Sequence, residues 1–352
     1  MKQIIVCIDG TWNEPGQIIR PPAGFSGDVP TNVYRIWNAF GGVLDGGSRE
    51  LGKIDQSNSI TLIYVRGVGT QTGWLSKRIQ GATGIGTAER VAFAYHLLSK
   101  CFTKGDKLYL FGFSRGAFAV RSLASMLHHM GIVAETSPDK ARDMVDTYRS
   151  VTPHRINSVP VEYMGVWDTV GAIPNAGDSV FKHDINPINV RSVRHALALD
   201  EIREQYAPEY WLKPNGSESD VTESWFIGAH ANIGGGYADA NLSNIALFWI
   251  LRGAQKAGLK IDARRVFGYE QEKESPPVDS WREFWKTPFI GTIIKTAGLY
   301  KEKRKVQPGQ RFHESVLEAI AQSKYTPTAV THEDTMLTPQ LMRTRTAPWE
   351  YE

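Results

Sequence analysis

The sequence predicts an α/β fold in which helices cover both faces of a mostly parallel central sheet. Short apolar runs alternate with helical patterns through residues 1–255, as is typical of parallel strands joined by helices. The first apolar run, residues 4–8, is continuous and rich in β-branched side chains, which is expected of a strand buried on both faces. The chain has 352 residues, of which 41% are hydrophobic and 22% charged, and is long enough for a large core.

The individual elements follow from local patterns. Strands are expected where short apolar runs end in turn residues, at residues 4–8, 59–65, 107–113, 161–167 and 224–228. Helices are expected where apolar residues recur at helical spacing, at residues 31–40, 87–101, 115–130 and 242–257. We interpret residues 190–200 as helix-like, and the polar or Gly- and Pro-rich stretches as linkers, at residues 15–30, 41–58 and 213–223.

The alternation of strands and helices stops after about residue 258. The remaining residues mix an aromatic segment, a basic run and a last helix near residues 314–322. We therefore expect a core domain over residues 1–257 and a helical cap or C-terminal extension over residues 258–352.

Charge and cysteine content exclude several classes of protein. The formal net charge of +3 is too small to indicate a nucleic-acid partner. Cys7 and Cys101 lie in apolar stretches and are expected to be buried thiols rather than a disulfide framework. The N-terminal apolar run is too short for a signal peptide, so we expect synthesis in the cytoplasm. Residues 81–87 are glycine-rich but lack the lysine of a nucleotide-binding loop, and neither a cofactor nor a metal is expected.

A strand-to-helix turn carries the candidate nucleophile, Ser114. It directly follows an expected strand, precedes an apolar helix and has the sequence Gly112-Phe113-Ser114-Arg115-Gly116. Glycines on both sides of the serine permit a strained turn that projects the hydroxyl above the C-terminal edge of the sheet. The N-terminus of the following helix favours negative charge developing there. The alternative is an ordinary turn with Ser114 as the helix N-cap.

A serine nucleophile needs a base that is itself oriented by an acid. Asp168 ends the expected strand 161–167, so it should lie on the same edge of the sheet as Ser114. His230 follows the strand 224–228 and enters a glycine-rich loop, so it can approach Ser114. Asp168 could instead be a helix N-cap and His230 a structural loop residue. Four residues remain as alternative bases and acids, namely His183, His195, Asp178 and Asp200.

The expected oxyanion hole combines two backbone donors. One is the N–H of Arg115, directly after the nucleophile, and the other is the N–H of Thr11 in the loop after the first strand. Gly10 lets the backbone approach, and the Asp9 carboxylate can orient the loop. The Asp-Gly-Thr sequence is also similar to that of phosphohydrolases with an aspartate nucleophile, but Cys7 occupies the nucleophile's position.

Taken together, these motifs resemble the α/β-hydrolase family of largely uncharacterised bacterial and fungal proteins that includes the phospholipase effectors of type VI secretion. The resemblance implies an α/β-hydrolase fold, lipase, phospholipase or esterase activity, and a triad of Ser114, Asp168 and His230. Five or six motifs occur in the family's order, namely residues 9–13, 67–70, 112–117, 165–171, 195–201, and 225–230 with 234–237.

One departure from the family's pattern concerns Asn232, where relatives usually carry Asp two positions after the histidine. If that carboxylate tunes the histidine or holds an ion, rate or metal dependence should differ here. The resemblance also implies an immunity or secretion partner and delivery by a secretion system that needs no signal peptide.

Residues 281–305 bear on the substrate. They combine aromatic and aliphatic side chains such as Trp285 and Phe289 with lysines and arginines, a composition typical of interfacial membrane segments. A lid or a packed helical cap would look similar, and Pro288 and Gly291 interrupt any long amphipathic helix.

The sequence therefore predicts a serine hydrolase that cleaves acyl esters of lipids or small molecules through an acyl-enzyme. The alternatives are a metal-dependent phosphohydrolase and a binding protein with a degenerate hydrolase fold.

Overall fold

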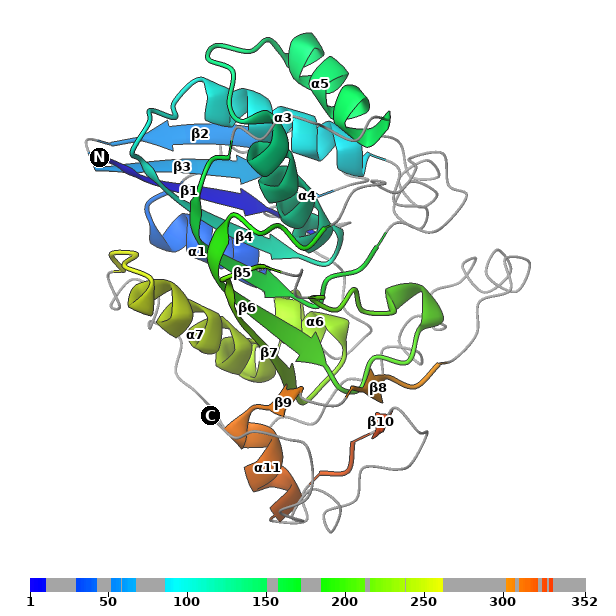
Figure 1. Ribbon diagram of the computed structural model, residues 1–352. Helices are drawn as coiled ribbons and strands as arrows, with labels where there is room; N and C mark the ends of the chain where they lie inside the picture. Colours follow the sequence, from blue (N-terminus) through cyan, green and yellow to red (C-terminus); the bar gives the residue numbers. More distant parts are fainter. Residues whose placement is uncertain are drawn as a thin grey trace, which may run out of the picture.

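An eight-stranded, mostly parallel sheet forms the centre of the computed structural model, in the order β2-β3-β1-β4-β5-β6-β7-β9 (Figure 1). Only β2 runs antiparallel to its neighbour. The strands are β1 (Gln3–Ile8), β2 (Gly52–Gln56), β3 (Ile60–Val65), β4 (Lys107–Phe113), β5 (Val161–Trp167), β6 (Val190–Ala198), β7 (Asp220–Phe226) and β9 (Arg311–Phe312). The structure describes residues 1–10, 30–42, 52–57, 59–67, 86–150, 158–171, 185–212, 216–237, 239–261, 302–307, 310–321, 325–327 and 329–331.

Helices cover both faces of the sheet, as the sequence predicts. On one face lie α3 (Thr87–Ser99), α4 (Arg115–Met130) and α5 (Pro138–Ser150); on the other lie α1 (Asn32–Ala39) and α7 (Asn241–Lys256) (Figure 1). Strand β1 shows why both faces are apolar. Its Ile4 and Val6 join the core beneath α3 and α4, whereas Ile5 and Cys7 join the core beneath α1 and α7.

The C-terminal part of the chain adds to this core. Strand β9 pairs with β7, and α11 (Glu314–Ala321) follows it. A second small sheet pairs β8 (Lys305–Val306) with β10 (Val330–Thr331). A third apolar cluster joins these elements to the central strands through residues that include Leu197, Trp225, Val306 and Phe312. The domain boundary between residues 257 and 258 stays a prediction.

One expected element is wrong. Residues 190–200 are not helical, since Val190–Ala198 forms strand β6 between β5 and β7. Helices pack over both faces of the sheet, so this strand shows little polar alternation, and Val190, Val193 and Leu197 happen to recur at helical spacing.

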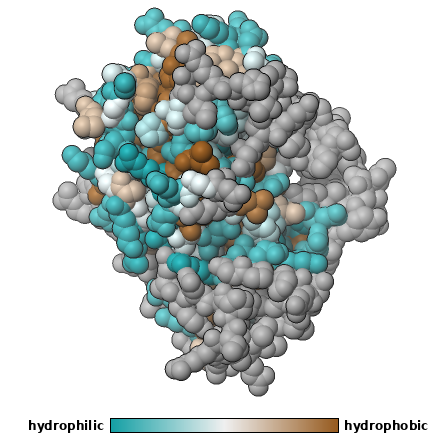
Figure 2. All heavy atoms as spheres, viewed as in Figure 1, coloured by the Kyte–Doolittle hydropathy of each residue, from teal (hydrophilic) through white to brown (hydrophobic). Residues whose placement is uncertain are grey.

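Three further elements of the structure differ from those expected from the sequence. Strand β2 lies inside the expected linker 41–58, β7 begins inside the expected insertion 213–223, and the polar helix α5 was not expected. On the face shown in Figure 2, hydrophilic residues dominate the described surface and apolar patches are small.

Candidate active site

Ser114 occupies a strained turn between β4 and α4. Its φ of 58° and ψ of −125° are uncommon for a residue other than glycine. A Cβ on Gly112 would lie 2.6 Å from the carbonyl oxygen of Gly116, and a Cβ on Gly116 would lie 2.2 Å from that of Ile8. Both flanking glycines are therefore needed for the turn, which has the geometry expected of a nucleophile elbow.

Asp168 and His230 form a buried hydrogen-bonded pair at the same edge of the sheet. Asp168 directly follows β5, and His230 begins the short helix α6 (His230–Gly234) after β7. The distance from His230 Nδ1 to Asp168 Oδ2 is 2.6 Å. Asp168 has a φ of 39°, and its Oδ1 accepts the Ala198 N–H at 3.1 Å. This backbone bond fixes the carboxylate, which directs Nδ1 to carry the proton and leaves Nε2 of His230 free to act as a base.

Backbone contacts tie Ser114 to the strand that carries Asp168. The Ser114 N–H donates to the Trp167 carbonyl at 3.0 Å, and the Val170 N–H donates to the Ser114 carbonyl at 3.3 Å. The ring of Phe113 lies 4.5 Å from that of His230, centroid to centroid. The hydrogen bonds of the described residues include none between Ser114 and His230, so this contact of the triad stays a prediction.

The charges around Asp168 keep it ionised. Burial alone would raise the pKa of this carboxyl, but the Arg304 charge and the His230 hydrogen bond outweigh it and lower the pKa to about 2. Arg304 Nη2 donates to Asp168 Oδ2 at 2.9 Å. The carboxylate therefore stays available to orient His230 at neutral pH.

The surroundings of His230 favour the neutral imidazole. Burial lowers its pKa, partly opposed by the bond to Asp168, and the charge of Arg203 lowers it further. The ring of Tyr206 packs edge-on against His230 at 4.7 Å. The backbone N–H of His230 donates to Glu201 Oε2 at 3.3 Å. A neutral imidazole is the form that can accept a proton from a serine.

Asn232 caps the helix that begins with His230. Its Oδ1 accepts the Ala229 N–H at 3.1 Å, so the side-chain amide supplies the oxygen that a carboxylate would supply at this position. The departure from the family's pattern thus leaves the local support of His230 in place.

The loop that should complete the oxyanion hole starts beside the nucleophile turn. Strand β1 pairs with β4, with Ile8 opposite Gly112. Asp9 Oδ1 accepts the Gly10 N–H at 2.7 Å, and Oδ2 accepts the hydroxyls of Thr31 and Tyr64, each at 2.7 Å. These bonds hold Asp9 in a buried, orienting position. Thr11 lies outside the described residues, and donation by Arg115 N–H and Thr11 N–H stays a prediction.

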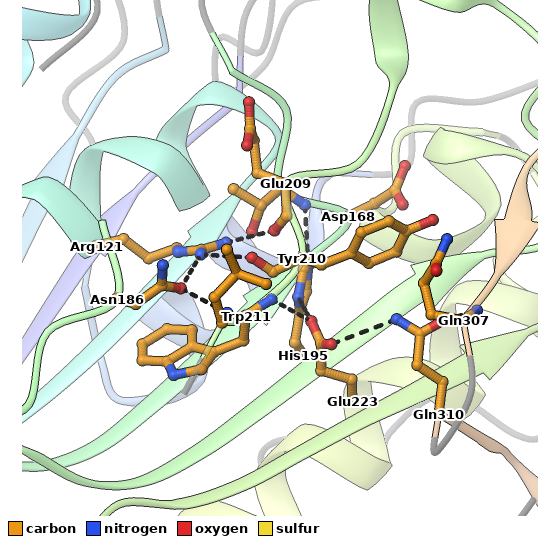
Figure 3. Close-up of polar contacts among 12 residues, drawn as sticks. Arg121, Asp168, Asn186, His195, Glu209, Tyr210, Trp211, Glu223, Gln307 and Gln310 are labelled. Atoms are coloured by element: carbon orange, nitrogen blue, oxygen red, sulfur yellow. Dashed lines mark hydrogen bonds and ion pairs between the residues drawn. The ribbon is translucent and has the colours of Figure 1, made fainter. Parts of the chain in front are cut away.

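A second histidine–carboxylate pair, His195 and Glu223, contacts the backbone next to Asp168 (Figure 3). His195 Nδ1 lies 2.7 Å from Glu223 Oε1, and His195 Nε2 accepts the N–H of Thr169, the residue after the acid, at 3.1 Å. With Nε2 occupied as an acceptor, Nδ1 carries the proton and donates to Glu223. Gln310 Nε2 donates to the other Glu223 oxygen at 3.4 Å. His195 is therefore placed to hold the backbone beside Asp168 and not to act as a base.

Arg121 links the nucleophile helix to the same network (Figure 3). Its guanidinium is fully buried and donates to the carbonyls of Ile185, Glu209 and Tyr210 and to Asn186 Oδ1, at 2.6 to 3.0 Å. Arg121 thereby fixes residues 209–210. The next residue, Trp211, donates its backbone N–H to Glu223 Oε1 at 2.8 Å.

The other candidates do not join the pair. Asp200 accepts the Gly228 N–H at 2.8 Å and the Tyr325 hydroxyl at 2.7 Å, which is a structural role. His183, Asp178 and most of residues 281–305 lie outside the described residues. No group of three or more His, Cys, Asp or Glu side chains that could hold a metal occurs in the described part of the chain. None of its helices is long and apolar enough to cross a membrane.

Sequence comparisons show a matching family model and a curated relative. The sequence model described as "T6SS, Phospholipase effector Tle1-like, catalytic domain" matches residues 2–157 and 150–253. The uncharacterised protein YEL023C of Saccharomyces cerevisiae is 25% identical over 239 residues, which are 58% of this chain and 32% of the yeast protein. The chain thus corresponds to about a third of that relative.

Three solved structures are also similar. An uncharacterised protein from Pseudomonas aeruginosa has a TM-score of 0.43 at 17% identity, covering 76% of this chain and 47% of its own. The Tle1 effector, solved bound to the VgrG spike of the type VI secretion system, has a TM-score of 0.34 at 20% identity, covering 67% and 51%. Est1E from Butyrivibrio proteoclasticus has a TM-score of 0.31 at 8% identity, covering 72% and 89%.

Proposed function

Because this chain belongs to the family of Tle1-like phospholipase effector catalytic domains of the type VI secretion system, we propose that it hydrolyses acyl esters of lipids with Ser114 as nucleophile. The family and the α/β-hydrolase fold are those of an ester hydrolase. The observation that carries the proposal is the Asp168–His230 pair, bonded at 2.6 Å on the sheet edge that also bears the strained Ser114 turn.

The proposed reaction has two steps. His230 Nε2 removes the hydroxyl proton of Ser114 while Ser114 Oγ attacks the ester carbonyl carbon. The backbone N–H groups of Arg115 and Thr11 stabilise the oxyanion that forms. His230 then gives the proton to the departing alcohol. Water attacks the acyl-enzyme with His230 again as base, which releases the acid and restores Ser114. Asp168 holds the imidazole tautomer in both steps.

Family membership also supports a proposal about delivery. Tle1 itself is bound to a VgrG spike in its solved structure, so we propose a secretion-spike or immunity partner for this chain and export that needs no signal peptide. Peripheral membrane contact through residues 281–305 stays a prediction.

Hydrolysis of phospholipid vesicles and of short- and long-chain p-nitrophenyl esters tests the proposal. Ser114→Ala should lower turnover by several orders of magnitude and keep the fold. Ser122→Ala is the matched control, because Ser122 lies on the same helix and its hydroxyl bonds only the Phe118 carbonyl among the described residues, at 3.0 Å. Equal activity of wild type and Ser114→Ala would contradict the proposal. The relative rates on vesicles and soluble esters would separate a phospholipase from a general esterase.

A further inference from the structure

Arg304 reaches the candidate acid from the C-terminal part of the chain. It lies 136 residues after Asp168, and its Nη2 donates to Asp168 Oδ2 at 2.9 Å. This is the same oxygen that His230 Nδ1 contacts at 2.6 Å. Asp168 is fully buried and Arg304 is 4% exposed, so solvent does little to screen the pair.

The segment that carries Arg304 is fixed on both sides. Before it, the Glu302 N–H donates to the Ile202 carbonyl at 2.9 Å. After it, the Tyr210 hydroxyl donates to the Lys305 carbonyl at 2.9 Å. Val306 is buried in the apolar cluster with Leu197, Trp225 and Phe312. These contacts fix the backbone that carries Arg304, independently of the ion pair with Asp168.

The hydrogen bonding of Arg304 does not fit a purely structural arginine. Its Nε and Nη1 are buried and have no hydrogen-bond partner within the described part of the chain. The buried Arg121, by contrast, donates from all three of its nitrogens. Burying a guanidinium with unsatisfied donors is costly. Among the described residues Arg304 makes one hydrogen bond, and its acceptor is the acid of the candidate triad.

We propose that Arg304 is a positioning residue for the hydrolysis, which holds the Asp168 carboxylate charged and turned toward His230. The proposal rests on the proposed function of the site. Without Arg304, the contacts that the described residues make with Asp168 are the His230 bond to Oδ2 and the Ala198 N–H bond to Oδ1. The carboxylate is then less restrained against rotation about its Cβ–Cγ bond. The imidazole then spends less time in the orientation that accepts the serine proton, so turnover falls while ester binding does not change.

A double-mutant cycle tests this role in the full-length chain, with kcat and KM measured on a p-nitrophenyl ester. Arg304→Gln should lower kcat by about 10- to 100-fold and leave KM unchanged. Arg304→Lys keeps a charge and should retain more activity than Arg304→Gln. In an Asp168→Asn background, Arg304→Gln should change kcat by less than about twofold, because the carboxylate that it positions is gone.

Two results would overturn the role of Arg304: wild-type kcat in Arg304→Gln, or an equal loss of kcat in both backgrounds, which marks a structural role. If Arg304→Gln does not fold, Arg304→Met, which also lacks the charge, gives the same comparison in both backgrounds. The cycle is interpreted only against an active wild type and an inactive Ser114→Ala. An inactive wild type or an active Ser114→Ala contradicts the proposed function itself. An active wild type with unchanged kcat in Arg304→Gln contradicts only the proposed role of Arg304.

Discussion

At the scale of single residues, the candidate site combines a buried histidine with a buried, charged carboxylate. Three of the residues involved could be predicted from the sequence, because Ser114, Asp168 and His230 each directly follow a strand pattern or lie within a few residues of one. Arg304 and the His195–Glu223 pair could not. Their contacts join positions 136 and 28 residues apart, and no local pattern marks them.

The lowered pKa of His230 predicts the acid limb of the activity profile. Burial is its main cause, and the ordinary value is 6.5. Protonated His230 cannot accept the Ser114 proton, so kcat/KM should fall on acidification only below about pH 6.5. The profile can be measured with a soluble ester between about pH 4 and 9. A fall in kcat/KM that begins above pH 7 would contradict the assignment of His230 as the base, because it would require a base whose pKa is raised and not lowered.

Two buried carboxyls predict how stability depends on pH. Burial would raise the pKa of both, but partner charges lower that of Asp168 from 3.8 to about 2 and that of Glu201 from 4.5 to about 2. Both pKa values are lower in the folded state. Their stabilisation is therefore nearly complete above about pH 5 and is lost as pH falls toward 2, by about 2 kcal/mol for Asp168 and about 3 kcal/mol for Glu201. Urea unfolding at a series of pH values measures this loss. Glu201→Gln should flatten the curve, and an unchanged curve would refute the linkage.

At the scale of elements, the decisive feature is the close approach of β1, β4 and α4. The sequence predicts all three correctly because the strands are short apolar runs and the helix is apolar at helical spacing. It could not predict that residues 190–198 form a strand, since a central strand with both faces covered carries no alternation to separate it from a buried helix.

Gly116→Ala should damage the turn. The new Cβ would lie 2.2 Å from the backbone oxygen of Ile8, which cannot move without shifting β1. We expect a loss of about 1–3 kcal/mol in unfolding free energy, together with loss of activity, because the loop that begins at Asp9 moves with β1.

Gly216→Ala is the control for this substitution. Its Cβ would meet no atom within 4 Å, so only the strain of a φ of +78° remains, about 1 kcal/mol or more. Activity should be kept. Equal activity in Gly116→Ala and wild type would show that the close approach is not required.

At the scale of the whole molecule, the C-terminal part is joined to the core by a strand, an apolar cluster and Arg304. The sequence predicts the helix near residues 314–322, which is confirmed as α11, but not the attachment itself. The strands described within residues 302–331 have two residues each, too short for any periodicity. A two-residue strand such as β9 forms because β7 offers an edge strand with which it can pair.

Phe312→Ala tests whether this attachment stabilises the whole fold. Phe312 is 1% exposed, lies opposite Trp225 in the sheet and packs in the third apolar cluster. Its truncation should cost about 3–5 kcal/mol, measured by urea unfolding. Activity and tryptophan fluorescence should be lost in one shared transition. Glu318→Ala, on the exposed side of α11, should cost less than about 0.5 kcal/mol. Separate transitions in Phe312→Ala would show that the C-terminal part folds independently.

The most direct test of the central claim is covalent labelling of the full-length protein with a fluorophosphonate, followed by intact mass and peptide mapping. An activated serine attacks this reagent, and an ordinary one does not. The account predicts one adduct per chain, on Ser114, in wild type and in Ser122→Ala, and none in Ser114→Ala. Absence of an adduct in the folded wild type, or an adduct that persists in Ser114→Ala, would contradict Ser114 as the nucleophile.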